Sequence, residues 1–235
     1  MELKKIIERC DDLYRDLNLT YVREWKKTNS AKAIGYMPVY VPRELIHAAG
    51  MLPVLIMGGG DETEIIRGDA YFQSYICRIP RSTIELGVSG KMDSLDGLLF
   101  PAICDVIRNL SGMWKMLFPQ TYIRYVDLPQ DFKKSGHTFY RHDLDELKSD
   151  FEKISGNKIT DDRLRKSIAA YNENRQAIEA LYNLRAEIPH KVLTHEVYLL
   201  MRASNILEVT EHTQLVQNYM AAIVKSDRPF RDYVR

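Results

Sequence analysis

Two of the three cysteines lie in sequence contexts that favour chemistry over packing. Cys104 follows the apolar run FPAI and precedes Asp105, so it is expected where a strand ends and a helix begins. Open parallel sheets bind ligands at the carboxyl ends of their strands, and the amides of a helix N-terminus favour a thiolate there. The alternative is that Cys104 is a small buried hydrophobe, the usual state of a free cysteine.

Cys77 stands in the segment SYICRIPRS, which is predicted to be a proline-containing loop. Arg78 and Arg81 favour the thiolate form of Cys77 if the fold brings them near the sulfur, and a structural role remains an equal alternative. Cys77 and Cys104 are 27 positions apart, a spacing that matches neither CxxC nor the ferredoxin run. Cys10, in an N-terminal helical pattern, is interpreted as structural or as a surface residue.

The other chemical motifs are missing or weak. Residues 58–61 (GGGD) have neither the GxGxxG nor the GxxxxGK[ST] pattern, and they favour a strand-ending loop that approaches another backbone closely. The 6 histidines show no HExxH or other metal spacing, and there is no GxSxG nucleophile elbow. The candidate chemistry therefore depends on the cysteines.

The elements that must position these thiols alternate between strand and helix. Hydrophobic patterning predicts strands at 32–37, 52–57, 95–101 and 122–127, and helices at 2–28, 43–50 and 105–117. Pro42 and Gly50 are typical of the start and the end of a helix. Strands that alternate with helices indicate parallel βαβ units with both sheet faces covered. From His142 onward the pattern is helical only, at 142–154, 160–186, 194–201 and 209–224, with Thr160 as a helix cap.

The predicted fold class is therefore α/β: a parallel, Rossmann-like βαβ unit with an N-terminal helix and a following all-helical region. We divide the chain into an N-terminal helix (1–31), an α/β domain that carries both candidate thiols (32–140) and a helical region (141–228). Residues 229–235 (PFRDYVR) are interpreted as the start of a second α/β domain.

Composition limits the classes of partner. The chain has 235 residues, 45% of them hydrophobic, and a net charge of +1, which provides no field for nucleic acid or an anionic membrane. No apolar run approaches the ~20 residues of a membrane helix, and the charged N-terminus is not a secretory signal. An odd number of cysteines without an export signal argues against disulfides. We expect a cytoplasmic protein that binds neither nucleic acid nor membranes.

Four segments together resemble one family. They are residues 35–50 (GYMPVYVPRELIHAAG), 75–82 (YICRIPRS), 100–108 (FPAICDVIR) and 171–175 (YNENR). The first is similar to the opening block of the benzoyl-CoA reductase / 2-hydroxyacyl-CoA dehydratase family, the next two to its cysteine-bearing segments, and the last to its YNxxR helix. The resemblance covers nearly the whole chain, and it implies that Cys77 and Cys104 are ligands of a [4Fe–4S] cluster.

Within the family, these blocks look most similar to the C-type subunits of ATP-dependent benzoyl-CoA reductases, which dearomatise benzoyl-CoA. The resemblance implies an iron–sulfur subunit of a heteromeric oxidoreductase that takes part in electron transfer to an aromatic acyl-CoA substrate. Its implied partners are a second cluster-bearing subunit, ATP-hydrolysing activator subunits and reduced ferredoxin. The alternatives are a 2-hydroxyacyl-CoA dehydratase subunit, which eliminates water through a ketyl radical, and a cluster-less interaction or scaffold domain of the same fold.

The sequence departs from the family pattern at two points. Met37 stands where many members of the family have a cysteine, so that position is not counted as a ligand. Subunits of the family also continue into a second α/β domain that supplies a third cysteine ligand. The chain is therefore expected to be the N-terminal part of such a subunit and to be inactive in isolation. Arg78 and Arg81 are expected to stabilise the charge of the cluster, to contact a partner subunit, or to belong to a solvated or salt-bridged loop.

Overall fold

The computed structural model describes residues 2–229, which form two compact units. The α/β unit comprises residues 17–165, and the helical unit comprises residues 1–16 and 166–235. The second boundary lies within the first turns of a long helix. Apart from residue 229, the segment interpreted as the start of another domain (229–235) lies outside the described residues.

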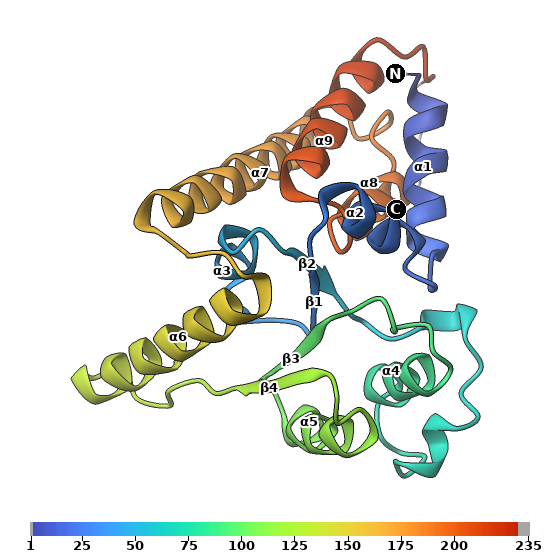
Figure 1. Cartoon of the computed structure of the whole chain (residues 1–235). Coiled ribbons are helices and arrows are strands. Elements are labelled where there is room, and N and C mark those ends of the chain that lie inside the picture. The colour runs from blue at the N-terminus through green and yellow to red at the C-terminus, as the bar shows by residue number, and fades with distance from the viewer. Residues whose placement is uncertain (1, 230–235) are drawn as a thin grey trace. The chain divides into compact units, whose positions relative to one another are not determined.

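The α/β unit is built on a parallel sheet (Figure 1). Its strands are β1 (Ala33–Tyr36), β2 (Leu52–Leu55), β3 (Gly97–Pro101) and β4 (Tyr122–Val126), in the spatial order β2-β1-β3-β4. All paired strands run parallel, with Ala33 opposite Leu52 and Gly97 opposite Tyr122. Every residue of β1 and β3 is buried, as expected for a sheet covered on both faces. The predicted α/β class is confirmed.

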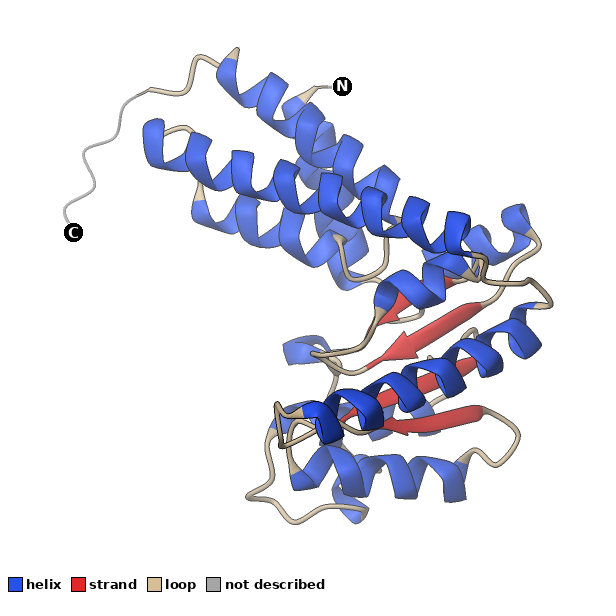
Figure 2. Ribbon diagram, turned by 90° about the vertical axis from the view of Figure 1, so that its left-hand side faces the viewer, coloured by secondary structure: helices blue, strands red, loops and turns tan. Residues whose placement is uncertain are grey.

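Helices cover both faces of this sheet (Figure 2). On one face lie α3 (Arg43–Ala48) and α6 (Lys134–Ser155), whose Ile46, Leu147 and Phe151 are fully buried in a cluster with strand residues. On the other face lie α4 (Arg78–Val88) and α5 (Asp105–Leu117). There the Trp114 ring of α5 packs 6.0 Å from the ring of Phe100 on β3, measured between centroids. The sheet is therefore the middle layer of three.

The predicted N-terminal helix is two helices, α1 (Leu3–Arg15) and α2 (Thr20–Asn29). The chain turns between them at Leu19, which has a left-handed backbone conformation (φ 53°). The prediction of one helix was wrong because the apolar spacing continues across the turn although the two stripes face different cores. Ile6 and Cys10 of α1 are buried in the helical unit, and Val22 of α2 is buried in the α/β unit.

Two further elements differ from the sequence prediction. Helix α4 begins at Arg78 and includes residues 78–82 of the segment predicted to be a loop (74–82), because Pro80 occupies its first turn, where a missing N–H breaks no hydrogen bond. Helix α6 begins at Lys134 and packs on the sheet through Leu147 and Phe151, although its C-terminal part was assigned to the helical region. The compact units thus divide at 165/166, whereas the predicted domains divide at 140/141.

The helical unit contains α1, α7 (Asp161–Glu187), α8 (Thr194–Ala203) and α9 (Val209–Val224), with the first five residues of α7 in the α/β unit. Its core includes a buried carboxylate, Glu196, which accepts hydrogen bonds from the Tyr219 hydroxyl (2.8 Å) and from Arg228 Nη1 (2.8 Å). A buried charge is tolerated when it is paired in this way. Within residues 2–229, no helix has both the length and the apolar character required to cross a bilayer.

Candidate functional site

The carboxyl ends of the strands form one edge of the α/β unit. In the sheet, β2 lies on one side of β1, and β3 and β4 lie on the other. The strand order therefore reverses between β1 and β3, which makes this the topological switch point. Ligands bind at such a switch point in open α/β sheets. The segments that leave this edge after β1, β3 and β4 are residues 37–42, 102–104 and 127–133.

Both candidate thiols are exposed residues at the starts of helices. Cys104 is the N-cap of α5, and Cys77 is the N-cap of α4. Neither side chain makes a capping hydrogen bond. Asp105 is the first residue of α5. Each sulfur therefore belongs to the residue that immediately precedes the first turn of a helix, where the unpaired backbone N–H groups carry a partial positive charge.

The two helices are neighbours on the same face of the sheet. Gly87 of α4 lies against the Trp114 ring of α5, and a Cβ atom built on Gly87 meets that ring at 2.6 Å. Packed helices have axes about 8–10 Å apart. Cys77 and Cys104 therefore begin adjacent helices that both start at the carboxyl edge of the sheet.

The loop that precedes Cys77 is held by a buried carboxylate, Glu85 of α4. Its Oε2 accepts hydrogen bonds from the backbone N–H groups of Ile66 (2.9 Å), Arg67 (2.6 Å) and Gly68 (2.8 Å). Burial opposes ionisation of Glu85, but these N–H donors, led by that of Gly68, outweigh it and hold the pKa of the carboxyl below its usual range. The sequence analysis missed this residue because its partners are identified only by the fold.

Arg78 and Arg81 also bind this loop. Arg78 donates to the carbonyl oxygens of Gly60 (3.0 Å) and Thr63 (2.8 Å). Arg81 donates from Nε to Asp69 (2.7 Å) and from Nη1 to the Ser74 carbonyl (3.1 Å). Of the roles expected from the sequence for these two arginines, these contacts agree with a role within their own loop. The guanidinium groups fix the approach of the chain to Cys77.

Cys10 belongs to the helical unit, not to the α/β unit that carries this edge. It is fully buried on α1 in the helical unit. Burial raises the pKa of the Cys10 thiol to about 11, although the charge of Arg9 lowers it in part. Its assignment as a structural cysteine agrees with this position, because a buried neutral thiol is a poor metal ligand.

The donor set fits part of a cluster site. Exposed thiols are the ligand type of iron–sulfur clusters, and this edge presents two of them. Across residues 2–229, no group of three or more His, Cys, Asp and Glu side chains is arranged to hold a metal ion. A cluster at this edge needs at least one ligand in addition to those that the described residues bring together.

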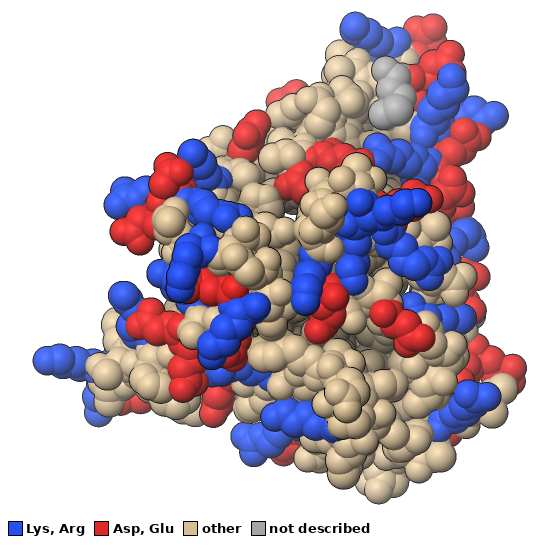
Figure 3. Space-filling model, in the orientation of Figure 1, with Lys and Arg blue, Asp and Glu red and all other residues tan. Residues whose placement is uncertain are grey.

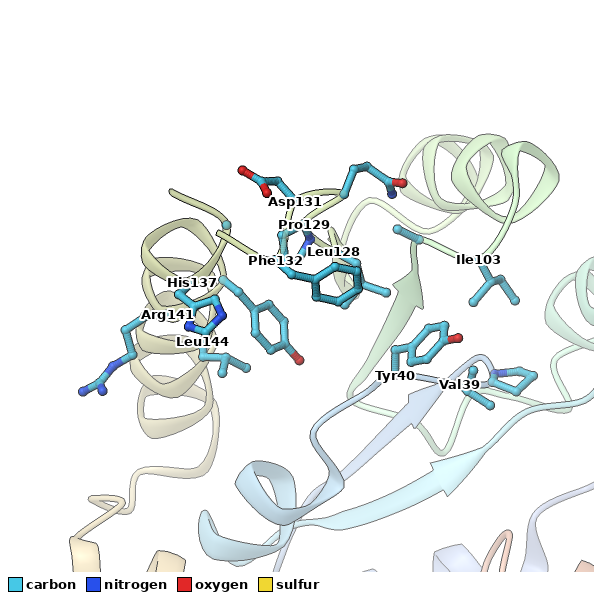
Figure 4. Close-up of a pocket in the computed structure, with 15 residues that line it drawn as sticks. Val39, Tyr40, Ile103, Leu128, Pro129, Asp131, Phe132, His137, Arg141 and Leu144 are labelled. Carbon is cyan, nitrogen blue, oxygen red and sulfur yellow. The ribbon is translucent and has the colours of Figure 1, made fainter. Parts of the chain in front are cut away.

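An apolar hollow of about 1080 Å³ opens at the same edge (Figure 4). It is lined by the segments that follow β1, β3 and β4 and by the first turns of α6, namely Pro38, Val39, Tyr40, Ala102, Ile103, Leu128, Pro129, Gln130, Asp131, Phe132, Gly136, His137, Tyr140, Arg141 and Leu144. Tyr40 has a left-handed backbone (φ 56°), a conformation that costs a bulky residue about 1–3 kcal/mol and often marks functional sites. Of its lining residues, 38–40 lie in the sequence block at 35–50, and 102–103 lie in the block at 100–108.

The fold and this edge define a class: an α/β protein with a hollow at its switch point and two exposed thiols at the N-cap positions of neighbouring helices. The chain belongs to the family described as 2-hydroxyglutaryl-CoA dehydratase, D-component (HGD-D), whose profile matches residues 38–233. The predicted family is thereby confirmed.

Individual relatives are subunits of acyl-CoA enzymes. The C-type subunit of benzoyl-CoA reductase from Thauera aromatica is 57% identical over 237 residues, which cover 100% of this chain and 61% of the relative. The (R)-phenyllactyl-CoA dehydratase beta subunit of Clostridium sporogenes is 32% identical, covering 86% of this chain and 54% of the relative. The beta subunit of (R)-2-hydroxyglutaryl-CoA dehydratase from Acidaminococcus fermentans is 30% identical, covering 81% and 51%. The chain thus spans about half to three fifths of the length of these relatives.

Proposed function

We propose that this chain is part of the C-type, iron–sulfur subunit of an ATP-dependent benzoyl-CoA reductase. The observation that carries this choice is the 57% identity to the C-type subunit of benzoyl-CoA reductase over the entire chain, against 32% and 30% to two dehydratase beta subunits. The proposed substrate is an aromatic acyl-CoA. The proposed partners are a second cluster-bearing subunit, ATP-hydrolysing activator subunits and ferredoxin, all in the cytoplasm.

In this proposal Cys77 and Cys104 are ligands of a [4Fe–4S] cluster. When bound, such a cluster supplies one-electron transfer at low potential. The chain contributes two thiolates at helix N-termini, whose partial positive charge offsets their negative charge. Glu85, Arg78 and Arg81 position the first thiolate by fixing the loop before it. In this proposal the remaining ligands of the cluster are not among the side chains that the described residues place together.

The ligand assignment is tested by anaerobic iron–sulfide reconstitution of the chain. We expect a Cys77→Ser, Cys104→Ser double variant to lose most of the iron and the visible absorption that the unchanged chain acquires. Cys10→Ala is the matched control and is expected to retain both, because Cys10 is buried in the other unit. Equal cluster content in the double variant and the unchanged chain would falsify the assignment.

The reaction is tested on the assembled complex. We expect complexes that contain this chain to reduce benzoyl-CoA with ATP and reduced ferredoxin, and to leave 2-hydroxyacyl-CoA thioesters unchanged. The opposite preference, dehydration of a 2-hydroxyacyl-CoA without ring reduction, would assign the chain to the dehydratases.

A further inference from the structure

The packing contact between α4 and α5 lies at the same position in both helices. Gly87 comes ten positions after Cys77, and Trp114 comes ten positions after Cys104. At a rise of about 1.5 Å per residue, each thiol-bearing N-cap is about 15 Å from this contact along its own helix. Helix α4 leads into β3 and α5 leads into β4, and these strands are parallel, so both helices run in the same direction. Helices that touch at equivalent positions bring their first residues to a similar level.

We propose that Gly87 and Trp114 form a spacer that sets the distance between the two candidate thiols. They are positioning residues, because they act through the helices that Cys77 and Cys104 precede. The inference rests on the proposed function and deepens it, since the spacing of two thiolates decides whether both can bind one cluster.

Gly87 is the point at which the two helices approach each other without a side chain between them. Its backbone is that of the helix, without a positive φ, so the close approach and not the conformation requires glycine there. A Cβ atom built on Gly87 lies 2.6 Å and 2.9 Å from two carbon atoms of the Trp114 ring and 3.0 Å from Phe118 Cζ. Carbon atoms in contact are about 3.5–4.0 Å apart, so a Cβ atom at this position requires a shift of about 1 Å.

Trp114 is held on the opposite side of this contact by two other rings. It is buried, and its ring lies 6.0 Å from the ring of Phe100 on β3 and 4.8 Å from the ring of Phe118, measured between centroids. Aromatic pairs at such distances are favourable beyond the area that they bury. The Trp114 ring therefore joins β3, the end of α5 and the backbone of α4 at one place.

The separation of α4 from α5 depends on packing. The charged side chains of α4 are Arg78, Arg81 and Glu85, and each of them binds the loop before Cys77. In Figure 3, the surface over α4 and over the neighbouring side of α5 has few charged side chains. Close-packed contacts respond to the addition of a single methylene group, whereas exposed ion pairs add little to stability.

A small cavity beside the contact leaves room for the ring to move. Its volume is about 190 Å³, and Gly87, Trp114 and Phe118 are among its lining residues. A side chain added at position 87 is therefore accommodated by a shift of the ring and of α5. For this reason we expect such variants to fold with the two helices displaced.

Dipolar electron paramagnetic resonance measures the spacing of the thiols without a cluster. Nitroxide labels are attached to Cys77 and Cys104 of the full chain in a Cys10→Ala background, which leaves these two as its only thiols. For neighbouring helices we expect one label-to-label distance on the order of 10–20 Å, the interaxial distance together with the label arms. A much longer distance in this parent chain overturns the inference.

Graded substitutions at position 87 test the spacer. We expect Gly87→Ala to change the label-to-label distance by about 1 Å and Gly87→Val to change it further, because each added atom needs space that the ring fills. Gly112→Ala is the matched control and is expected to leave the distance unchanged, since a Cβ atom built on Gly112 of α5 meets nothing within 4 Å. An unchanged distance in both Gly87 variants, or an equal change in the control, overturns the inference.

A smaller ring at position 114 tests the other half of the spacer. The two Trp114 atoms nearest the built Cβ belong to the six-membered part of the indole, and the shorter side chain of phenylalanine does not reach as far. We expect Trp114→Phe, added to Gly87→Ala, to restore the distance of the parent chain. General destabilisation is not reversed when further core atoms are removed. A double variant that keeps the altered distance of Gly87→Ala therefore overturns the role of Trp114.

Iron content after reconstitution of the unlabelled variants separates this inference from the proposed function. We expect Gly87→Val to take up less iron than Gly112→Ala, and the double variant with Trp114→Phe to recover it. If the distances respond as expected but the double cysteine variant binds as much iron as the parent chain, the ligand assignment alone is overturned. If the double cysteine variant loses its iron but the Gly87 variants keep the parent distance, the spacer alone is overturned.

Discussion

At the scale of single residues, Glu85 determines how the chain reaches its first candidate ligand. One carboxylate oxygen receives three consecutive backbone N–H groups, from Ile66 to Gly68, in a loop with little regular structure of its own. Charged acceptors form hydrogen bonds roughly twice as strong as neutral ones. We infer that the position of Cys77 depends on this carboxylate, although Cys77 precedes α4 and Glu85 lies within that helix.

Replacing the carboxylate tests its contribution. We expect Glu85→Gln to lower the free energy of unfolding by about 1–3 kcal/mol at pH 7, because an amide satisfies these donors less well. Since the folded-state pKa of Glu85 is lowered, its stabilisation is present above the unfolded pKa of about 4.3 and is lost as the pH falls through the folded value. Urea unfolding of both proteins between pH 7 and pH 3 should show the difference shrinking on acidification, and a constant difference would contradict this account.

At the scale of elements, the connection from β2 to α4 is restricted by glycine. Gly58 has a φ of 70°, and a Cβ atom built there lies 2.1 Å from Ser82 Oγ and 3.0 Å from the Ile79 carbonyl oxygen. The loop thus approaches the first turn of α4 closely, as predicted for the GGG segment. This contact holds the end of β2 near the start of the helix that Cys77 caps.

Gly58 and Gly156 have similar backbone conformations, so comparing them separates the cost of a left-handed backbone from the cost of a steric clash. Gly156, the C-cap of α6, has a φ of 74° but no atom within 4 Å of its built Cβ. We expect Gly156→Ala to cost about 1–2 kcal/mol, for the left-handed backbone alone. Gly58→Ala should cost about 1–3 kcal/mol more because of the clash. Thermal and urea unfolding measure both, and equal losses would show that the close approach has no energetic effect.

Helix α5, which follows Cys104, contains a glycine whose replacement by alanine is expected to stabilise the protein. Gly112 is exposed in the helix interior, and a Cβ atom built on it meets nothing within 4 Å. We expect Gly112→Ala to raise the free energy of unfolding by about 0.5–1 kcal/mol, because alanine loses less conformational entropy in a helix. Cluster content after reconstitution should not change. A destabilised variant would indicate that α5 needs this flexibility.

At the scale of the whole molecule, the chain has two compact units, and each contains an arginine paired with carboxylates. In the α/β unit, Arg124 of β4 pairs with carboxylates on one face of α6, among them Asp143 and Glu146. In the helical unit, Glu196 has 4% of its side chain exposed and is paired with Arg228, 25% exposed, from the segment after α9. The last described residues thus contribute to the core of their own unit.

Removing this partner should affect the helical unit strongly. We expect Arg228→Met to destabilise it by about 3–5 kcal/mol, because Glu196 keeps its hydrogen bond from Tyr219 but loses the positive charge of Arg228. Lys4→Met is the control in the same unit: the Lys4–Glu8 pair is 84% and 58% exposed, and such pairs contribute about 0–1 kcal/mol. Hydrogen exchange should show lost protection in α8 and α9 for the first variant only, and similar exchange in both would contradict the assignment.

The sequence alone determined the features that depend on local patterns. Strand–helix alternation, together with caps and apolar spacing, was sufficient for the α/β class, for α5 at Asp105–Leu117 and for α9 at Val209–Val224. The predicted cap at Thr160 is confirmed, because its hydroxyl oxygen accepts a hydrogen bond from the backbone N–H of Arg163. Cys104 was expected between a strand and a helix, and it is there. Each of these signals lies within a few residues of its effect.

Only the tertiary structure decided the features that join distant segments. The turn at Leu19 depends on which core each half of an apolar stripe meets, and the partners of Glu85 and Arg78 lie 15 to 19 positions away. The hollow combines four separate segments, none of which has a ligand motif of its own. Composition and periodicity report whether a side chain is buried, but the identity of its neighbours is a consequence of packing.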